Sequence, residues 1–394
     1  MTALDRFLSR DAGSFRPSAI RAFAKLINDP NVISFAGGVP NPETFPADSI
    51  AEIAARVVRE RRGVALQYGP TRGLPRLTEA IASICRGRGI ECSAADILVT
   101  TGSQQALDLI AHAFLDPDDV VLVELPTYIG GTASFYARSA RLIGVAQDDD
   151  GIVPESLDEA AARSHPKLVY TIPNFQNPSG RLMAQERRRQ VLELAERHDF
   201  LVIEDDPYGE LVYVEGADTT AMKSRDSSGR VLYLGSFSKV LAPGLRCGWI
   251  VAPPGMAAKL EIAKQAADLC SGMLDQSIVD EFIAAGELPG QIAKVRDFYR
   301  GKRGILIEAL AEHFAGRATW TSADGGLFSF VTFPEGVDTG AKVEEAVKRG
   351  VAYIPGAPFF VDGSGANTMR LTFAKESDDN IREGVRRLAS TFQF

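Results

Sequence analysis

Residues 95–255 alternate between short apolar runs and amphipathic stretches, and this alternation constrains the fold more than any other feature of the sequence. The run Val120–Val123 is continuously apolar, as expected for a strand that is buried on both faces of a sheet. Gln185–His198 has the spacing of an amphipathic helix, with the Arg187-Arg188-Arg189 run expected on its solvated face. The alternation predicts an α/β fold with a largely parallel sheet covered by helices.

The pattern changes along the chain. In the first part, strands are expected at Ile97–Thr100, Val120–Val123, Lys167–Ile172, Phe200–Ile203, Val231–Leu234 and Gly248–Ala252. Long helical stretches follow from Met256 to about Leu310, with an interruption expected near Gly286–Gly290. In the last part, strands are expected at Gly326–Phe333, Val351–Ile354 and Thr368–Phe373. We therefore expect a large central α/β domain and a smaller C-terminal one.

Composition excludes several classes of partner. The chain has 43 Lys and Arg against 51 Asp and Glu, a formal net charge of −8, which disfavours nucleic acid. No apolar run approaches the length of a membrane span, and no secretory leader is recognised at the N-terminus. The 4 cysteines form no C-x-x-C pair, and the 4 histidines share no ligand spacing. We expect a cytoplasmic protein with no membrane partner, no nucleic-acid partner and no metal site.

Chemistry-bearing residues follow the expected strands, and open α/β sheets bind ligands beyond the carboxyl ends of their strands. The Gly102-Ser103-Gln104 turn opens a helix whose free N–H groups suit a phosphate, although many such turns look similar. Tyr128 follows the second strand, where a lone tyrosine is usually packing. The segment Pro173–Gly180 is dense in amide side chains, which turn chemistry alone would also explain.

Two further strand ends carry charge. Glu204, Asp205 and Asp206 follow one strand, and they indicate either a nearby cation or protonated ring nitrogen, or a solvated loop. Lys239 follows the next strand, where a desolvated amine has a lowered pKa and becomes a nucleophile toward carbonyls. Arg246 supplies a permanently charged fork for a phosphate. Together, the strand ends predict a site for an anionic aldehyde cofactor.

The run Ser236-Phe237-Ser238-Lys239 also matches the S-x-x-K motif of penicillin-binding enzymes. In those enzymes the serine and lysine open a helix, whereas Pro243-Gly244 follows closely here. The partner motifs K-T-G and S-D-N are absent from the chain. This alternative is therefore excluded.

Taken with Pro243–Trp249, the Ser236–Lys239 run resembles the lysine signature of fold type I pyridoxal-phosphate enzymes. The branch it resembles contains the 2-aminoadipate and kynurenine (aromatic) aminotransferases. Further matching motifs lie at Ser34–Gly38, Gln67–Pro70, Thr101–Gln104, Gln176–Gly180, Glu204–Tyr208 and Asn367–Arg370. The resemblance implies a large cofactor-binding domain, residues 46–290, with a mostly parallel central sheet between helices. It also implies a smaller α/β domain, residues 291–394, joined by an N-terminal segment and substrate lid, residues 1–45.

The resemblance implies roles for the cofactor site. Lys239 would hold pyridoxal 5'-phosphate as a Schiff base and then act as the base that moves the substrate proton. Asp205 would pair with the pyridinium nitrogen. Asn177 and Tyr208 would hydrogen-bond the ring oxygen, and Tyr128 would stack on the ring. The residues around the phosphate would be Gly102, Ser103, Gln104, Ser236, Ser238 and Arg246.

The resemblance also implies roles for a second subunit and for the substrate. Tyr68 would reach the phosphate from the other subunit, so that a homodimer is expected. Arg370 would clasp the substrate α-carboxylate, assisted by Gly38 and Asn177. Arg21 lies in a segment like one that closes over the substrate side chain in relatives, although the residue alone reads as an ordinary surface arginine.

The implied activity is transfer of an α-amino group from a 2-aminoadipate-like or aromatic amino acid to 2-oxoglutarate by a ping-pong mechanism. A lyase, decarboxylase or oxidase on the same fold is the alternative enzyme. A ligand-sensing domain of a transcription regulator is disfavoured, because the motifs begin near Ser34 and leave no room for a winged helix. Ser14, Asn174 and Leu269–Gly272 depart from related sequences, which leaves the side-chain specificity open.

Overall fold

The computed structural model describes residues 5–9, 11–15 and 31–392. Its main sheet has eight strands in the order β2-β9-β8-β7-β6-β3-β4-β5. Their bounds are β2 Ile97–Thr101, β3 Val120–Leu125, β4 Arg141–Asp148, β5 Gly151–Ile152, β6 Leu168–Thr171, β7 Leu201–Asp205, β8 Val231–Ser236 and β9 Cys247–Val251. Strands β4, β3, β6, β7 and β8 run parallel to one another, whereas β9 is antiparallel to both of its neighbours and β5 to β4. The expected α/β class with a mostly parallel sheet is confirmed.

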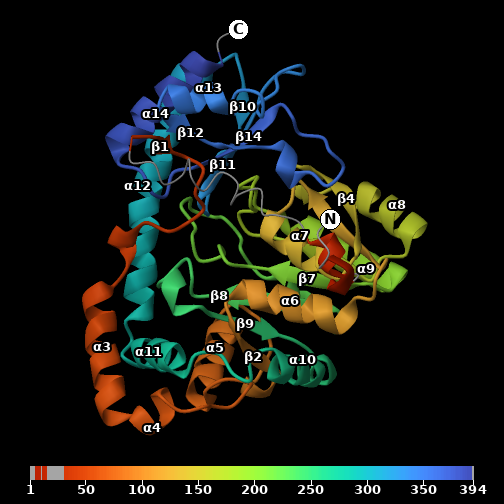
Figure 1. Cartoon of the computed structure of the whole chain (residues 1–394), viewed down its shortest axis with the longest axis vertical. Coiled ribbons are helices and arrows are strands. Elements are labelled where there is room, and N and C mark those ends of the chain that lie inside the picture. The colour runs from red at the N-terminus through yellow and green to blue at the C-terminus, as the bar shows by residue number, and fades with distance from the viewer. Residues whose placement is uncertain (1–4, 10, 16–30, 393–394) are drawn as a thin grey trace.

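Both faces of this sheet are buried. On β3, Val121 and Val123 belong to one hydrophobic cluster, and Val120 and Leu122 belong to another. Because successive side chains of a strand point to opposite faces, a continuous apolar run is needed when helices cover both sides. Helix α6 (Ser103–Phe114) contributes to the first cluster, and α8 (Pro154–Ser164) and α9 (Gln185–His198) contribute to the second. Figure 1 shows α6 on one side of the strands, with α8 and α9 beyond β4 and β7.

A second, antiparallel sheet of four strands has the order β10-β11-β14-β13. Its strands are β10 Thr319–Trp320, β11 Phe328–Thr332, β13 Ile354–Pro355 and β14 Thr368–Thr372. Beside it, β1 (Ile33–Ser34) pairs in parallel with β12 (Val351–Ala352), which ties the segment before residue 45 to the C-terminal part of the chain. The long helix α12 (Leu288–Phe314) runs from the region of α11 up to this second sheet and packs on α14 (Figure 1).

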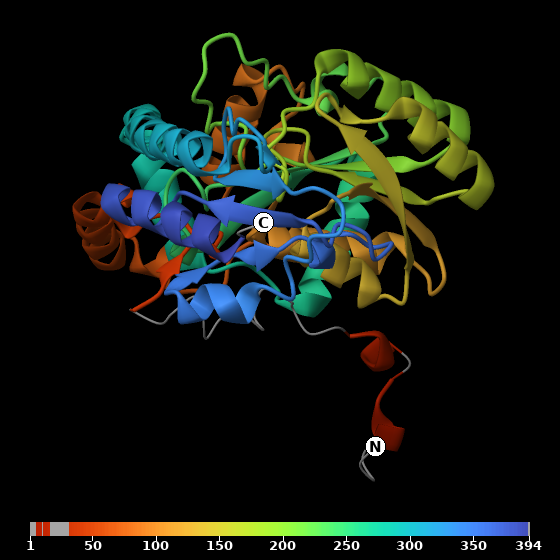
Figure 2. The same cartoon turned by 90° about the horizontal axis from the view of Figure 1, so that it is seen from above.

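The remaining helices lie around the two sheets. They are α3 Ala47–Glu60, α4 Arg62–Ala65, α5 Pro75–Gly87, α7 Ile129–Tyr136, α10 Pro254–Ala267, α11 Met273–Ala284, α13 Val343–Lys348 and α14 Asp378–Thr391. The short 3-10 helices are η1 Asp5–Phe7, η2 Asp11–Ser14, η3 Pro42–Thr44, η4 Ala94–Asp96, η5 Met222–Arg225, η6 Pro243–Leu245 and η7 Ala357–Phe359. Figure 2 shows η1 and η2 projecting away from the two sheets. No helix in the described part of the chain is long and apolar enough to cross a membrane.

Three sequence-based expectations were wrong in detail. The single strand expected at Val351–Ile354 is two short strands that pair in different sheets. The helical stretch after residue 254 is interrupted not only near Gly286 but also at residues 268–272, where Leu269 has a φ of 65°. Arg188 does not lie on the solvated face of α9, because its side chain is fully buried. The division into domains at residues 290 and 291 stays a prediction, and α12 runs across that position.

Candidate active site

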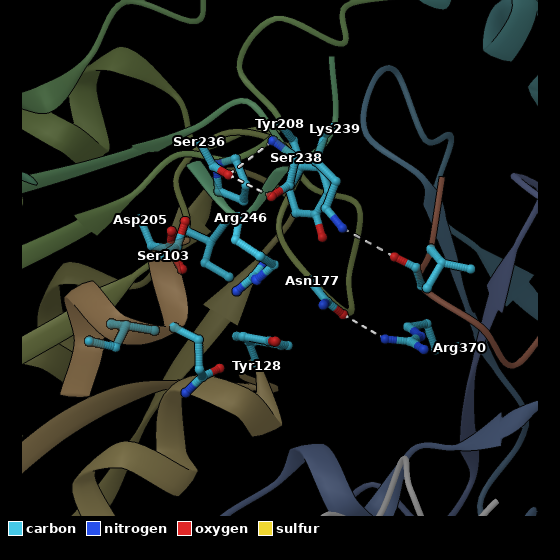
Figure 3. Close-up of a pocket in the computed structure, with 16 residues that line it drawn as sticks. Ser103, Tyr128, Asn177, Asp205, Tyr208, Ser236, Ser238, Lys239, Arg246 and Arg370 are labelled. Atoms are coloured by element: carbon cyan, nitrogen blue, oxygen red, sulfur yellow. Dashed lines mark hydrogen bonds between the residues drawn. The ribbon is translucent and has the colours of Figure 1, made fainter. Parts of the chain in front are cut away.

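A cavity of about 320 Å³ lies at the carboxyl ends of the parallel strands, between the eight-stranded sheet and Arg370 of β14. The predicted site residues that line it are Gly38, Ser103, Gln104, Tyr128, Asn177, Asp205, Tyr208, Ser236, Ser238, Lys239, Arg246 and Arg370. Figure 3 shows these side chains converging from several strand ends on one space, with Arg370 facing it from the opposite side. The topology therefore gathers residues that are up to 332 positions apart in the sequence, from Gly38 to Arg370.

Lys239 follows β8 and reaches into the cavity. Its Nζ donates a hydrogen bond to the carbonyl oxygen of Gly38 at 3.2 Å and lies 5.9 Å from the centre of the Tyr208 ring. Desolvation by the surrounding protein lowers the pKa of Lys239 to about 8, and the cations Arg370 and Arg246 act in the same direction. An amine with such a pKa is available as a neutral nucleophile near physiological pH.

Asp205 ends β7 and is buried at the base of the cavity. Its Oδ2 accepts a hydrogen bond from the hydroxyl of Tyr170 at 2.9 Å, whereas its Oδ1 is buried with no hydrogen-bond partner among the described residues. Burial is the main reason why the pKa of Asp205 rises to about 7, and the Tyr170 hydrogen bond opposes that rise. A buried carboxylate oxygen without a partner is unfavourable unless a cationic donor meets it.

The solvated loop that was the alternative for Glu204–Asp206 is wrong, since all three carboxylates are buried. Glu204 accepts hydrogen bonds from the backbone N–H groups of Met222 and Lys223, at 2.7 Å each. Asp206 pairs with Arg88 at 2.6 Å. Each neighbour of Asp205 thus has its own partner outside the cavity, and Asp205 alone of the three lines it.

The first turn of α6 and Arg246 form an anion cradle. Gly102 caps the helix with a φ of 74°, and a Cβ at this position would collide with the Arg246 guanidinium. Arg246 donates from Nη2 to the carbonyl oxygen of Thr101 at 3.0 Å and has no acidic partner among the described residues. Ser103 Oγ is buried without a hydrogen-bond partner there. A helix N-terminus and an uncompensated guanidinium together suit a phosphate.

Serine and glutamine side chains complete the cradle. Ser236 Oγ donates to Ser238 Oγ at 2.9 Å and accepts from the Ser238 backbone N–H at 3.1 Å, which fixes the turn before Lys239. Gln104 Nε2 donates to the Gly130 carbonyl at 2.8 Å and to Ser134 Oγ at 2.9 Å, so that Gln104 ties α6 to α7.

Arg370 is the cation on the opposite side of the cavity. Its Nη1 donates to Asn177 Oδ1 at 2.9 Å and its Nη2 donates to the Ala36 carbonyl at 2.7 Å. The guanidinium carbon stacks 4.4 Å from the centre of the Phe328 ring. Arg370 is only 1% exposed, and burial lowers its pKa to about 10. No acidic side chain in the described ranges pairs with it.

Among the described residues, two predicted site residues do not line this cavity. Tyr68 is 78% exposed and lies outside the lining, and Gly102 lies next to Arg246 at the start of α6 without lining the cavity itself. Arg21 falls outside the described residues, and its predicted role stays a prediction. The sequence interpretation in turn missed the lining residues Val39, Leu107, Ile172 and Pro207, which carry no chemical motif. It also missed Tyr170, because a tyrosine inside an apolar strand is normally a packing residue.

Arg188 was missed for a different reason. Its guanidinium donates to the carbonyls of Met183, Thr220 and Pro173 at 3.0, 2.8 and 3.2 Å, and to Asn174 Oδ1 at 2.7 Å. It therefore holds the loop that follows β6 and carries Asn177. The helical spacing carried a signal that was overlooked, because Arg188 stands three and seven residues before Val191 and Ala195 and therefore shares their buried face of α9.

The cavity fits pyridoxal 5'-phosphate on several independent observations. Among the described residues, Asp205 Oδ1 and Ser103 Oγ have no hydrogen-bond partner. The first suits a cationic donor such as a protonated ring nitrogen, and the second suits a phosphate oxygen in the anion cradle. Gly102 leaves room for the Arg246 guanidinium beside the start of α6, which a Cβ at this position would displace. Lys239 offers an amine of lowered pKa for an aldehyde.

Comparison with known proteins agrees with this chemistry. Residues 30–388 match the family aminotransferase class I and II. The chain is 43% identical to aromatic-amino-acid aminotransferase 1 of Thermococcus litoralis, over 99% of this chain and 94% of that protein. It is 40% identical to the 2-aminoadipate transaminase of Thermus thermophilus, over 96% of this chain and 94% of that protein.

Among solved structures, the kynurenine aminotransferase of Pyrococcus horikoshii superposes with a TM-score of 0.94 at 42% identity, covering 99% of this chain and 97% of that one. That structure was solved with the amine form of the cofactor, PMP, in complex. The fold, the cavity and the matches lead to one conclusion: the chain belongs to the class I and II aminotransferase family and is a pyridoxal-phosphate-dependent aminotransferase of fold type I.

Proposed function

We propose that this aminotransferase moves the α-amino group of an aromatic or 2-aminoadipate-like amino acid to 2-oxoglutarate in a ping-pong cycle. The observation that carries the proposal is Arg370, a buried guanidinium with only neutral partners among the described residues. A buried cation of this kind is costly unless a carboxylate arrives to pair with it. Amino acids and 2-oxo acids share that carboxylate, so that one residue serves both halves of the cycle.

When bound, pyridoxal phosphate supplies an aldehyde that takes up the amino group and a ring that withdraws electrons from the substrate Cα. Lys239 moves the proton: because its pKa is lowered to about 8, a fraction of its Nζ is neutral near physiological pH and accepts the Cα proton of the donor, which it later returns. The Gly38 carbonyl, 3.2 Å from Nζ, orients that amine.

The other residues bind and orient. Arg370 and Asn177, already joined at 2.9 Å, hold the substrate α-carboxylate in a fixed direction relative to Lys239. Gly102, Ser103, Ser238 and Arg246 would hold the phosphate. Asp205 would accept a hydrogen bond from the ring nitrogen, and Tyr128 and Tyr208 would lie beside the ring.

The donor class is supported by the relatives and by the apolar part of the lining. Val39, Leu107 and Ile172 give part of the cavity an apolar wall. Two relatives at 40% identity or more are named for aromatic amino acids and for 2-aminoadipate. Arg21 is proposed to meet the side-chain carboxylate of acidic substrates. Arg21→Ala is therefore expected to raise KM for 2-aminoadipate and 2-oxoglutarate while leaving KM for phenylalanine unchanged.

We further propose that the active unit is a cytoplasmic homodimer. Val64 is 39% exposed, Leu66 62% and Tyr68 78%, which leaves a short segment with three large apolar or aromatic side chains in solvent. A second copy that covers it would also bring Tyr68 to the neighbouring phosphate cradle. Light scattering is expected to give twice the chain mass, and Tyr68→Phe is expected to weaken cofactor binding without changing that mass.

The test of the reaction is a panel of amino acids offered with 2-oxoglutarate, with glutamate as the product measured. Glutamate is expected from phenylalanine, tyrosine, kynurenine or 2-aminoadipate. A ping-pong cycle gives parallel lines in double-reciprocal plots at varied acceptor concentration. Release of ammonia, carbon dioxide or peroxide without glutamate would instead indicate a lyase, decarboxylase or oxidase.

A further inference from the structure

Tyr170 is a buried residue behind the cavity to which the proposed function assigns no part. It lies on β6, and its hydroxyl donates to Asp205 Oδ2 at 2.9 Å, whereas Asp205 Oδ1 has no partner in the described part of the chain. Figure 3 shows Asp205 between Ser236 and Ser103, at the edge of the cavity. The two oxygens of this carboxylate therefore differ: Oδ2 accepts the Tyr170 hydrogen bond, and Oδ1 is available to a ligand.

Packing holds the phenol in place. The Tyr170 ring is fully buried and meets Phe135 edge to face, with ring centres 5.5 Å apart. A Cβ on residue 131 would lie 2.7 Å from the ring carbons, so that Gly131 alone leaves room for the ring. Strand β6 is also paired on both sides, since Tyr170 lies opposite Val123 on β3 and Ile203 on β7. The dense packing around the ring therefore keeps the hydroxyl oxygen at Asp205.

Several charged and polar groups around Asp205 affect its protonation. Asp206 and Glu124 disfavour its ionised form, whereas Lys239 and the Tyr170 hydrogen bond favour it. The phenols of Tyr128 and Tyr208 face it across the cavity. In the described part of the chain, only Tyr170 donates a hydrogen bond to this carboxylate. A hydrogen bond to the charged form of an acid stabilises that form over the protonated one.

We propose that Tyr170 is a positioning residue that keeps the proton shared by Asp205 and the cofactor on the ring nitrogen. The inference rests on the proposed role of Asp205. One proton lies between Asp205 Oδ1 and the ring nitrogen, and its two positions have the same total charge: carboxylate with pyridinium, or carboxylic acid with pyridine. Tyr170 stabilises the first pair. A protonated ring withdraws electrons more strongly, so that Tyr170 acts on the rate of proton removal through Asp205.

The test is the 15N resonance of the ring nitrogen in holoenzyme loaded with 15N-labelled pyridoxal phosphate. Tyr170→Phe removes only the hydroxyl, and its resonance is expected to move from the pyridinium toward the neutral pyridine position. kcat is expected to fall about tenfold, the effect of one hydrogen bond to a charged group, with KM for the amino donor nearly unchanged. The matched control is Tyr233→Phe, because Tyr233 is an equally buried tyrosine that donates to Asp206 at 3.1 Å, outside the cavity. Its resonance is expected to stay at the wild-type position.

Asp205→Asn tests the premise, and its resonance is expected at the neutral pyridine position. A wild-type resonance in Tyr170→Phe beside a shifted one in Asp205→Asn would overturn the proposal and leave Tyr170 as packing. An unshifted resonance in Asp205→Asn would show that Asp205 does not control the ring nitrogen, and the proposal for Tyr170 would then fail. The glutamate assay on wild-type enzyme would still decide the proposed function. If Tyr170→Phe does not fold, Gly131→Ala places a methyl group against the ring and hydroxyl of Tyr170, which must shift from their position at Asp205. The resonance is expected to move in the same direction as in Tyr170→Phe, and an unshifted resonance there would overturn the proposal.

Discussion

Arg370 on β14 and Asn177 in the loop after β6 are joined by a hydrogen bond of 2.9 Å, the direct link across the cavity between the four-stranded and the eight-stranded sheet. The partners of the guanidinium, the Asn177 amide and the Ala36 carbonyl, are both neutral, which leaves its charge uncompensated. A substrate carboxylate that enters here meets a cation and an amide already oriented by one another.

Replacing Arg370 tests this arrangement. Arg370→Lys keeps a positive charge but loses the planar fork, and kcat/KM for both the amino donor and 2-oxoglutarate is expected to fall by about 100-fold or more. Cofactor binding, followed by the visible absorption band, is expected to remain. A variant with wild-type KM for both substrates would show that the carboxylate is held elsewhere.

Lys239→Ala is expected to abolish turnover, because the chain then has no amine at the end of β8 to bind the cofactor or to move the proton. Borohydride reduction followed by peptide mass spectrometry is expected to find the cofactor on Lys239 in the wild type and on no residue of the variant. Lys348→Ala, which changes an exposed lysine on α13, is the control and is expected to keep full activity. Retained transamination in Lys239→Ala would overturn the assignment of the catalytic base.

The raised pKa of Asp205 predicts how the stability of the cofactor-free protein depends on pH. Its pKa is about 7 in the fold against 3.8 for an ordinary carboxyl, so the folded chain binds more protons than the unfolded chain between these values. Ionisation of Asp205 therefore lowers the stability of the folded protein as pH rises from about 4 to about 7. Asp205→Asn removes the contribution, and its stability relative to wild type is expected to rise by roughly 4 kcal/mol between pH 4 and 8. Urea unfolding at fixed protein concentration measures the difference, and a constant difference across the range would contradict it.

Arg188 offers a prediction about the loop that carries Asn177. Arg188→Met leaves three backbone carbonyls and Asn174 Oδ1 without their donor, and the expected loss of stability is about 3 kcal/mol. The neighbouring Arg189→Ala removes ion pairs to Glu186 and Glu193 on the surface of α9 and is expected to change stability very little. Thermal unfolding of the two variants compares them directly, and similar melting temperatures would contradict a bracing role.

The sequence predicted the large sheet because β3, β6, β7 and β8 are apolar runs, and a strand buried on both faces has few other compositions. The strand ends were predictable for the same reason, since Asp205, Lys239 and the Gly102 turn each follow such a run. The helical spacing of Arg188 with Val191 and Ala195 indicated its inward face, but an arginine there is normally solvated. The carbonyls and the Asn174 oxygen that allow its burial come from loops whose positions the sequence does not show. The split of residues 351–355 was not predictable either. It follows from the pairing of β12 with β1, which is distant in sequence, and of β13 with β14 in the other sheet.

The Arg370–Asn177 link has a consequence for how such an enzyme diversifies. The residues assigned to the cofactor lie on the eight-stranded sheet and its loops, whereas the guanidinium assigned to the substrate stands on a different sheet built from later sequence. Mutations around β14 can therefore alter which amino acid is accepted without disturbing the residues assigned to the cofactor. Related enzymes can in this way change their amino-acid specificity while they keep the same reaction chemistry.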